Sequence, residues 1–366
     1  MEAIAAITPH ANAPFSIETI TVDGPRPDEV LVDIKAVGIC HSDLVMVSGG
    51  FGNAFPAVFG HEGAGVVLEV GSDVTKVSPG DKVLLTFNSC GACSRCRDND
   101  PSYCQHFITL NMACVREDGS SRLHREGEAL ADNFFGQSSF ASKSIAKERN
   151  VIKLKPDADL AMFAPLGCGV QTGAGAVLRS LSAKAGQSLV VIGGGAVGLS
   201  AVLGGKIAGC APIILIEPQA ARRAMGSTLG ADHTIDPAAV DIVVAVRALV
   251  PDGADLVVDS SGFVPTVTDS ISMLSNKGKL GLIGMPGALD AVLPVPIIQW
   301  ITIGGTVRGI VEGDSDPDVF LPQLIAHYEA GRLPFDRFVT VYPFDQINAA
   351  IADAHSGKSI KVVLTM

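Results

Sequence analysis

The stretch Ser188–Ser200, Ser-Leu-Val-Val-Ile-Gly-Gly-Gly-Ala-Val-Gly-Leu-Ser, decides the fold of this 366-residue chain. Its apolar run predicts a short buried strand, and the residues after the glycines predict a helix that extends to about Ala208. Between the two, Gly193, Gly195 and Gly198 form a Gly-x-Gly-x-x-Gly turn. Glycines at this spacing allow a tight turn, close helix–sheet packing and the approach of a pyrophosphate to the helix N-terminus. The stretch therefore predicts a dinucleotide-binding βα unit.

The sequence after this turn continues the same alternation. We expect strands at 213–216, 255–259 and 279–283, with helices at 220–229 and 240–249 between them. Strands that alternate with helices of about 10 to 15 residues are typical of βαβ units. This region is therefore predicted to be a doubly wound α/β domain with a parallel sheet.

The rest of the chain has a different pattern. Short extended runs separated by Gly and Pro, such as 30–34 and 65–70, predict a barrel-like antiparallel β domain before the turn. The end of the chain returns to an irregular pattern and closes with an expected strand at 360–364. We therefore expect residues 168–305 to be a dinucleotide-binding domain inserted between residues 1–167 and 306–366 of the β-rich domain.

Glu217 lies at the end of the strand after the glycine turn. A carboxylate there can accept hydrogen bonds from the adenosine ribose hydroxyls and would repel a 2′-phosphate, which favours NAD over NADP. Arg222 and Arg223 argue the other way, because either could meet that phosphate. A glycine-rich turn without any ligand is the alternative interpretation of the motif.

Four cysteines, Cys90, Cys93, Cys96 and Cys104, lie within fifteen residues. Four thiolates can complete a tetrahedral shell around Zn²⁺, and a closed shell of this kind is structural because no position remains for a substrate. An iron–sulfur cluster or unrelated thiols are the alternatives. The spacing predicts a structural zinc site.

Three dispersed residues, Cys40, His61 and Cys168, are candidate ligands of a second metal. They stand in Gly-Ile-Cys-His-Ser-Asp, Gly-His-Glu-Gly-Ala-Gly and Leu-Gly-Cys-Gly-Val-Gln-Thr-Gly. A catalytic zinc needs three protein ligands and one open position, and its ligands often come from distant segments. Each residue alone has an ordinary interpretation, a buried small thiol or a hydrogen-bonded histidine. The sequence leaves open whether the three converge.

Composition excludes several classes of function. The chain has 38 acidic and 27 basic side chains, a net charge of −11, and no basic cluster that would suit nucleic acid or an anionic membrane. The apolar stretches 160–178 and 189–205 are interrupted by glycines, so we do not expect them to span a membrane. The N-terminus lacks a basic region before an apolar run, so no signal peptide is expected. We expect a cytoplasmic enzyme.

Taken together, the motifs at 38–43, 60–65, 90–104, 166–173 and 193–200 resemble those of the zinc-dependent medium-chain alcohol dehydrogenases. The resemblance extends over essentially the whole chain. It implies a GroES-like catalytic domain, a Rossmann domain, two zinc ions per chain and NAD. The stretches 134–140 and 148–151 also resemble the aryl-alcohol (benzyl-alcohol) branch of the family.

The resemblance also implies roles for individual residues. Cys40, His61 and Cys168 would hold the catalytic zinc, the Cys₂His set that alcohol dehydrogenases use, and Ser42 would pass the alcohol proton toward the cofactor ribose. Many relatives carry a histidine where this chain has Val45, so the outer part of the proton relay is unassigned. The other implied roles are Glu62 and Asp43 supporting the ligands, His41 and Lys361 near the pyrophosphate, Thr172 and Val197 behind the nicotinamide, and Thr86 and Phe87 in the substrate cleft.

The expected function is an NAD-dependent, reversible oxidation of a primary aryl or allylic alcohol to the aldehyde, with benzyl-alcohol-like substrates favoured. A dehydrogenase for geraniol- or perillyl-type terpenoid alcohols is the alternative. The alternative from a different class of function is a dinucleotide-binding zinc protein that catalyses no reaction. We expect a homodimer or homotetramer, with the apolar stretch Ala291–Ile303 in the contact.

Overall fold

The computed structural model describes residues 1–366, which divide into two compact units. The first, β-rich unit comprises Met1–Cys168, Asp316–Pro322 and Val339–Met366, and the second comprises Gly169–Ser315 and Gln323–Phe338. The expected boundary at 305/306 differs from the structure, because Thr306–Gly309 forms strand β16 and pairs in parallel with the sheet of the second unit.

The second unit contains a parallel sheet of six strands in the order β13-β12-β11-β14-β15-β16. This is the 3-2-1-4-5-6 order of a doubly wound dinucleotide-binding fold. The glycine turn follows β11, where the strand order reverses. The strands are β11 Leu189–Ile192, β12 Ile213–Ile216, β13 His233–Ile235, β14 Ala254–Asp259, β15 Leu274–Leu282 and β16 Thr306–Gly309.

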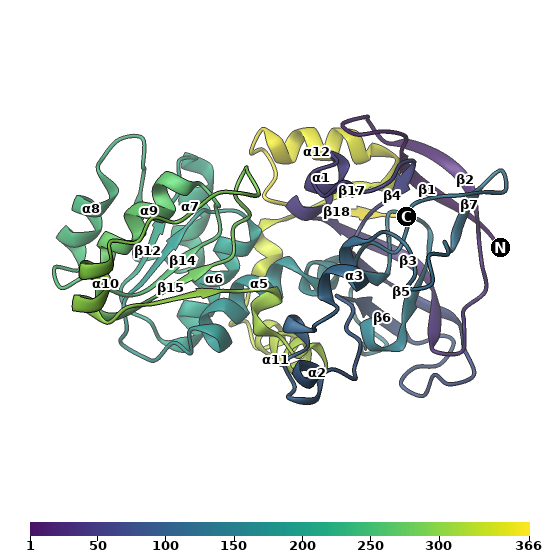
Figure 1. Ribbon diagram of the computed structural model, residues 1–366, viewed down its shortest axis with the longest axis horizontal. Coiled ribbons are helices and arrows are strands. Elements are labelled where there is room, and N and C mark those ends of the chain that lie inside the picture. The colour runs from purple at the N-terminus through teal and green to yellow at the C-terminus, as the bar shows by residue number, and fades with distance from the viewer. The chain divides into compact units, whose positions relative to one another are not determined.

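The apolar composition of the central strands explains their position. Every residue of β11 and β12 is buried, as expected for parallel strands covered on both faces. Helices surround the sheet (Figure 1), and Gly205 lets one of them approach closely, because a Cβ there would lie 2.5 Å from the Leu189 side chain. The helices are α5 Gly169–Gly175, α6 Ala196–Ala208, α7 Ala220–Leu229, α8 Ile242–Leu249, α9 Val264–Met273 and α10 Ile297–Ile303.

The β-rich unit contains two further sheets. One has the order β4-β1-β2-β7-β8, and the other has the order β10-β6-β5-β3-β18-β17, with β9 also paired to β3. The strands are β1 Glu2–Thr8, β2 Ser16–Val22, β3 Glu29–Ile39, β4 Ala57–Val58, β5 Glu62–Val70, β6 Lys82–Leu85, β7 Leu123–Arg125, β8 Glu128–Ala129, β9 Lys143–Lys147, β10 Val151–Lys153, β17 Val339–Pro343 and β18 Lys361–Thr365.

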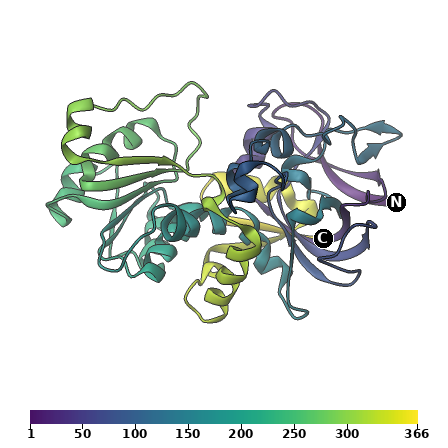
Figure 2. The same cartoon turned by 60° about the horizontal axis from the view of Figure 1, so that its bottom comes forward.

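Both ends of the chain contribute to this unit. Figure 2 shows the yellow C-terminal segment among the purple and blue N-terminal elements, in keeping with the antiparallel pairing of β18 with β3. The buried phenylalanines Phe59, Phe134 and Phe140 form the centre of its hydrophobic core. Its short helices are α1 His41–Val47, α2 Ser94–Arg97, α3 Phe107–Met112, α4 Leu160–Phe163 and α12 Ile347–His355, and α11 Pro317–Glu329 crosses the boundary between the units.

No single helix of the chain has both the length and the apolar composition needed to cross a membrane. A bent pair of helical segments, Leu160–Gly167 and Gly169–Ser180, meets those two criteria together.

Candidate functional site

The three dispersed candidate ligands converge in the β-rich unit. Cys40 follows the end of β3 and begins α1, His61 directly precedes β5, and Cys168 ends the first segment of the unit. The ligand atoms of these residues and of Glu62 all lie within 4.8 Å of one another. The structure therefore answers the question that the sequence left open.

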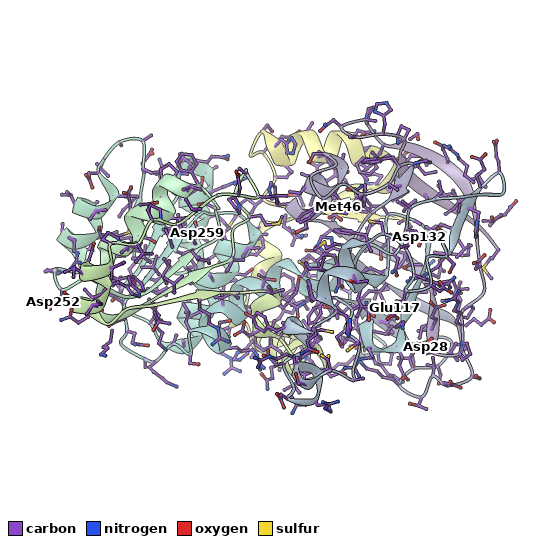
Figure 3. The ribbon with its side chains drawn as sticks, in the orientation of Figure 1. Asp28, Met46, Glu117, Asp132, Asp252 and Asp259 are labelled. Atoms are coloured by element: carbon purple, nitrogen blue, oxygen red, sulfur yellow. The ribbon has the colours of Figure 1, made fainter.

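Asp43 fixes the geometry of this cluster. One carboxylate oxygen accepts hydrogen bonds from His61 Nδ1 at 2.9 Å and from the Gly60 backbone N–H at 3.0 Å. The other accepts the Cys40 backbone N–H at 2.8 Å. Helix α1, which carries Asp43, is anchored in the core by Met46 (Figure 3). A single carboxylate thus orients two candidate ligands, as carboxylates beside metal-bound histidines commonly do.

The polar atoms of the cluster suit a soft divalent cation. His61 is fully buried, and its Nε2 has no hydrogen-bond partner, although buried ring nitrogens are normally bonded. Contact with Cys168 and His61 outweighs the opposing effect of burial and holds the pKa of Cys40 well below its ordinary value. Burial would lower the pKa of His61, but Asp43 and Cys40 raise it well above the ordinary range. Two sulfurs and one imidazole nitrogen are ligands that Zn²⁺ prefers.

Glu62 is paired with Lys361, the first residue of the last strand. The Lys361 ammonium forms a buried ion pair with the Glu62 carboxylate and donates to the Ile39 carbonyl at 2.9 Å. Burial opposes the charge on Lys361, but Glu62 raises its pKa above the ordinary value. Gly38 makes room for this carboxylate, because a Cβ at that position would collide with it. The positive charge of Lys361 is therefore balanced by Glu62, next to the candidate metal ligands.

Ser42 and Thr86 also lie in this unit. The Ser42 hydroxyl is half-buried and lies 4.0 Å from the Cys40 sulfur. The Thr86 hydroxyl donates to the Gly167 carbonyl at 2.7 Å, and Phe87 next to it is buried and contacts the ring of Phe107. The roles that the resemblance implies for Ser42, Thr86 and Phe87 stay predictions.

The four clustered cysteines converge at a second point of the same unit. The sulfurs of Cys90, Cys93, Cys96 and Cys104 lie within 4.8 Å of one another. Backbone N–H groups point at them, including Cys93 N–H to the Cys90 sulfur and Cys90 N–H to the Cys104 sulfur, both at 3.3 Å. Such donors lower the pKa of Cys93 to about 6. The set fits a closed tetrathiolate zinc site.

The glycine turn has the geometry that its spacing predicts. Gly193 has a φ of +96°, a conformation that favours glycine, and a Cβ on Gly198 would collide with the Gly193 carbonyl. Helix α6 begins at Ala196 after Gly195, and a Cβ on Gly195 would meet no atom within 4 Å. The backbone at the helix N-terminus is thus open to a phosphate group.

Glu217 lies beside this turn and is buried. Its two carboxylate oxygens accept the backbone N–H groups of Gly194 at 2.6 Å and of Gln219 at 2.7 Å. Arg223 is engaged elsewhere, with its guanidinium 2.9 Å from the Asp236 carboxylate. Arg222 differs, because its Nε is buried without a hydrogen-bond partner.

Three other residues of the second unit complete the set that sequence and geometry single out. Asp259 ends β14 (Figure 3) and accepts the backbone N–H groups of Ser261 at 3.1 Å and of Gly262 at 3.0 Å. In helix α5, the Thr172 hydroxyl donates to the buried carboxylate of Glu312 at 3.4 Å. Val197 lies in the first turn of α6, half-buried.

His41 and Lys361 belong to the β-rich unit, whereas the glycine turn, Thr172 and Glu217 belong to the second unit. The contact of His41 or Lys361 with a dinucleotide stays a prediction.

Sequence reasoning missed two residues that surround His61. Gln137 is buried, donates to the His61 carbonyl at 2.9 Å and accepts the Gly63 N–H at 3.1 Å. The ring of Phe135 stacks on the His61 imidazole. In the sequence, the stretch 134–140 indicates only a resemblance to the aryl-alcohol branch of the family. Nothing in its residue types predicts a contact with His61.

Comparisons with known proteins agree with this geometry. The family model "Alcohol dehydrogenase GroES-like domain" matches residues 26–156, and "Zinc-binding dehydrogenase" matches residues 196–326. Geraniol dehydrogenase from Castellaniella defragrans is 43% identical over 366 residues, which cover 100% of this chain and 98% of that protein.

Two solved structures are similar over nearly their full lengths. Benzyl alcohol dehydrogenase from Acinetobacter calcoaceticus is 35% identical with a TM-score of 0.97, covering 100% of this chain and 99% of that one. An alcohol dehydrogenase zinc-binding domain protein from Burkholderia ambifaria is 43% identical with a TM-score of 0.98 and the same coverage.

Metal analysis distinguishes the two cysteine-containing sites. We expect the purified chain to hold about two zinc ions, and Cys40→Ser to hold about one while it stays folded, because the tetrathiolate set is intact. Cys93→Ser should also lose about one ion, with a lower unfolding temperature. The zinc content is measured by mass spectrometry of the digested protein.

Cys210→Ser is the matched control, since Cys210 is a buried thiol of the second unit outside both ligand sets. It should retain both ions. A Cys40→Ser protein with wild-type zinc content would remove Cys40 from the ligand set.

Proposed function

The chain belongs to the zinc-dependent medium-chain alcohol dehydrogenases, and from that premise we propose that it transfers hydride between NAD and a primary alcohol whose carbinol carbon is next to a π system. The product is the aldehyde, and the reaction is reversible. The observation that carries the proposal is the convergence of Cys40, His61 and Cys168, in which the Nε2 of the fully buried His61 is left without a hydrogen-bond partner.

Zinc held by these three residues would supply Lewis acidity at an open fourth position. The chain's own groups provide the rest. Asp43 holds His61 and Cys40 in place through its three hydrogen bonds, and the ion pair of Glu62 with Lys361 keeps a second carboxylate engaged. The Ser42 hydroxyl, at the start of α1, is the group that accepts the proton of the alcohol while it passes its own proton toward the cofactor ribose.

Benzylic alcohols are the favoured substrates in this proposal. The similarity to benzyl alcohol dehydrogenase supports them. So does an aromatic cluster of the β-rich unit, in which the ring of Phe107 contacts those of Phe87 and Phe135. Terpenoid allylic alcohols are the second candidate, favoured by the 43% identity to geraniol dehydrogenase. Both substrate types place a π system beside the reacting carbon, so one apolar cleft could accept both.

NAD is the proposed dinucleotide. The buried carboxylate of Glu217, held in place by two backbone N–H groups, would accept the ribose hydroxyls and repel a 2′-phosphate. Arg223 is paired with Asp236 and so is a poor phosphate ligand. Arg222 is the residue through which NADP could still be used, because its Nε has no partner.

The proposed assembly is a homodimer or homotetramer. Five large apolar side chains are each 70–76% exposed: Ile297, Ile298 and Ile301 lie on α10, and Leu289 and Val292 lie in the segment just before it. A patch of large apolar side chains with this exposure is typical of a protein contact surface. A cytoplasmic location is also proposed, because six of the eight cysteines lie in two candidate zinc sites, and clustered cysteines of this kind are typical of metal sites in a reducing compartment.

A substrate panel tests the proposed reaction. We expect the purified chain to form NADH rapidly with benzyl or cinnamyl alcohol, more slowly with ethanol, and to prefer NAD to NADP. Formation of reduced cofactor is followed by absorbance. Faster turnover of geraniol would move the substrate assignment to terpenoid alcohols. If protein that holds both zinc ions turned over none of these alcohols, the result would support a dinucleotide-binding zinc protein without catalytic activity.

Removing the Ser42 hydroxyl tests the proton transfer. Ser42→Ala should lower kcat by about 10²- to 10⁴-fold, the usual effect of losing a positioned proton-transfer group, and should leave the zinc content unchanged. Ser48→Ala is the matched control, because Ser48 ends the same helix and donates only to the Val45 carbonyl. Wild-type turnover in Ser42→Ala would exclude Ser42 from the reaction.

A charge in the apolar patch tests the assembly. Ile298→Asp should shift the sedimenting species to the monomer, because a carboxylate cannot be buried there without a partner. Ile108→Asp changes a similarly exposed residue of the other unit, 65% exposed, and should leave the assembly intact. An unchanged oligomer in Ile298→Asp would place the contact elsewhere.

A further inference from the structure

Phe135 has a backbone conformation that large side chains rarely adopt. Its φ is +51° and its ψ is +31°, in the left-handed region, and its side chain is buried. Asn133 and Gly136 on either side are also left-handed, but asparagine and glycine adopt this conformation readily. A bulky residue stays in this region only where the surrounding structure requires it, and such residues concentrate at functional sites.

The conformation places the Phe135 ring flat on the imidazole of His61. The two ring centroids are 4.4 Å apart and the ring planes differ by 25°. Phe134 meets the same imidazole edge-on, at 5.1 Å and 81°. Phe135 in turn meets Phe134 and Phe107 edge-on, at 80° and 89°. Its flat contact is therefore made with His61 and not with the neighbouring phenylalanines.

Buried hydrogen bonds hold the strained segment in place. The Asn150 side-chain amide donates to the Phe135 carbonyl at 3.0 Å and to the Thr86 carbonyl at 3.1 Å. The buried Arg122 guanidinium donates to the Gly136 carbonyl at 3.0 Å. The segment is thus tied to two other parts of the β-rich unit, which compensates the unfavourable conformation of Phe135.

The hydrogen bond from Nδ1 to Asp43 and the covalent link to Cβ restrain the His61 ring along one edge. The stacked ring of Phe135 and the edge-on ring of Phe134 add restraint against tilting of the imidazole, because they pack against the ring itself. Nε2 is then presented to the sulfurs of Cys40 and Cys168, whose positions lie within 4.8 Å of the His61 ligand atom.

We propose that Phe135 is a positioning residue of the catalytic metal site, which holds the His61 imidazole in the plane that directs Nε2 to the metal. This inference rests on the proposed role of His61 as a zinc ligand. Phe135 acts through His61 and contacts the imidazole face, so its contribution is to the geometry and lifetime of the metal site.

Phe135→Leu tests the proposal, because leucine fills similar volume but cannot stack on the imidazole. We expect the zinc affinity of the site to fall about 10- to 100-fold, the usual range for residues that orient metal ligands, so that zinc leaves the site for a chelator correspondingly faster. The visible ligand-field spectrum of the cobalt(II)-substituted protein should also change. Phe135→Tyr, which keeps the flat ring, should restore both the release rate and the spectrum.

Two further variants serve as references. Cys40→Ser retains only the tetrathiolate set and gives the baseline for zinc release from that site. Phe15→Leu makes the same substitution at a buried phenylalanine of the same core that contacts Phe140 and not His61, and it should behave as the wild type. If Phe135→Leu does not fold, Phe135→Met provides the same contrast.

A folded Phe135→Leu protein with wild-type release rate and spectrum would overturn the proposal. Equal changes in Phe15→Leu would also overturn it, since they would show a general loosening of the core. Failure of the proposed metal site gives a different result: the wild type and Cys40→Ser would then hold the same amount of metal, whatever residue stands at position 135. Failure of the proposed reaction alone would leave the zinc-release rates and the cobalt spectra of the variants as predicted, because neither measurement depends on turnover.

Discussion

The burial of charged metal donors is the constraint on which the β-rich unit depends. Thiolates and carboxylates cost several kcal/mol each when they leave water without a partner, and Asp43, Glu62 and His61 are fully buried here. Asp43 accepts hydrogen bonds from the His61 imidazole and from two backbone N–H groups. Glu62 forms an ion pair with the ammonium of Lys361. The two sulfurs of Cys40 and Cys168 and the Nε2 of His61 are the ligand types that a Zn²⁺ ion prefers.

This constraint explains why the unit is assembled from both ends of the chain. Lys361 is 322 residues from the Ile39 carbonyl that it contacts, and the pairing of β18 with β3 brings it there. Without that strand, Glu62 would be buried beside the thiolates with no positive charge. The second unit is therefore inserted in such a way that the C-terminal strand β18 can still pair with β3 of the β-rich unit. Gly38 on β3 supports the same arrangement, because any side chain there would displace the Glu62 carboxylate.

Sequence reasoning predicted those parts of the structure in which residue type and backbone conformation are linked. The apolar runs of β11 and β12, the Gly193 turn and the cysteine spacing each have a local physical cause, and all are present. It placed the end of the second unit too early because β16 is a short edge strand with partly polar, exposed residues. Such a strand lacks the buried pattern that identifies the central ones.

The convergence of Cys40, His61 and Cys168 could be inferred only from resemblance, since ligands from three segments carry no local pattern. Phe135 shows the same limit more sharply. Gly193 and Phe135 both have left-handed backbones, but a glycine signals that conformation by its type, whereas a phenylalanine signals the opposite. The sequence alone therefore does not reveal positions where tertiary contacts impose a backbone conformation that the residue type disfavours. The ring of Phe135 stacks on His61, a candidate metal ligand. The residue that sequence reasoning could not identify is therefore one of those nearest the proposed catalytic site.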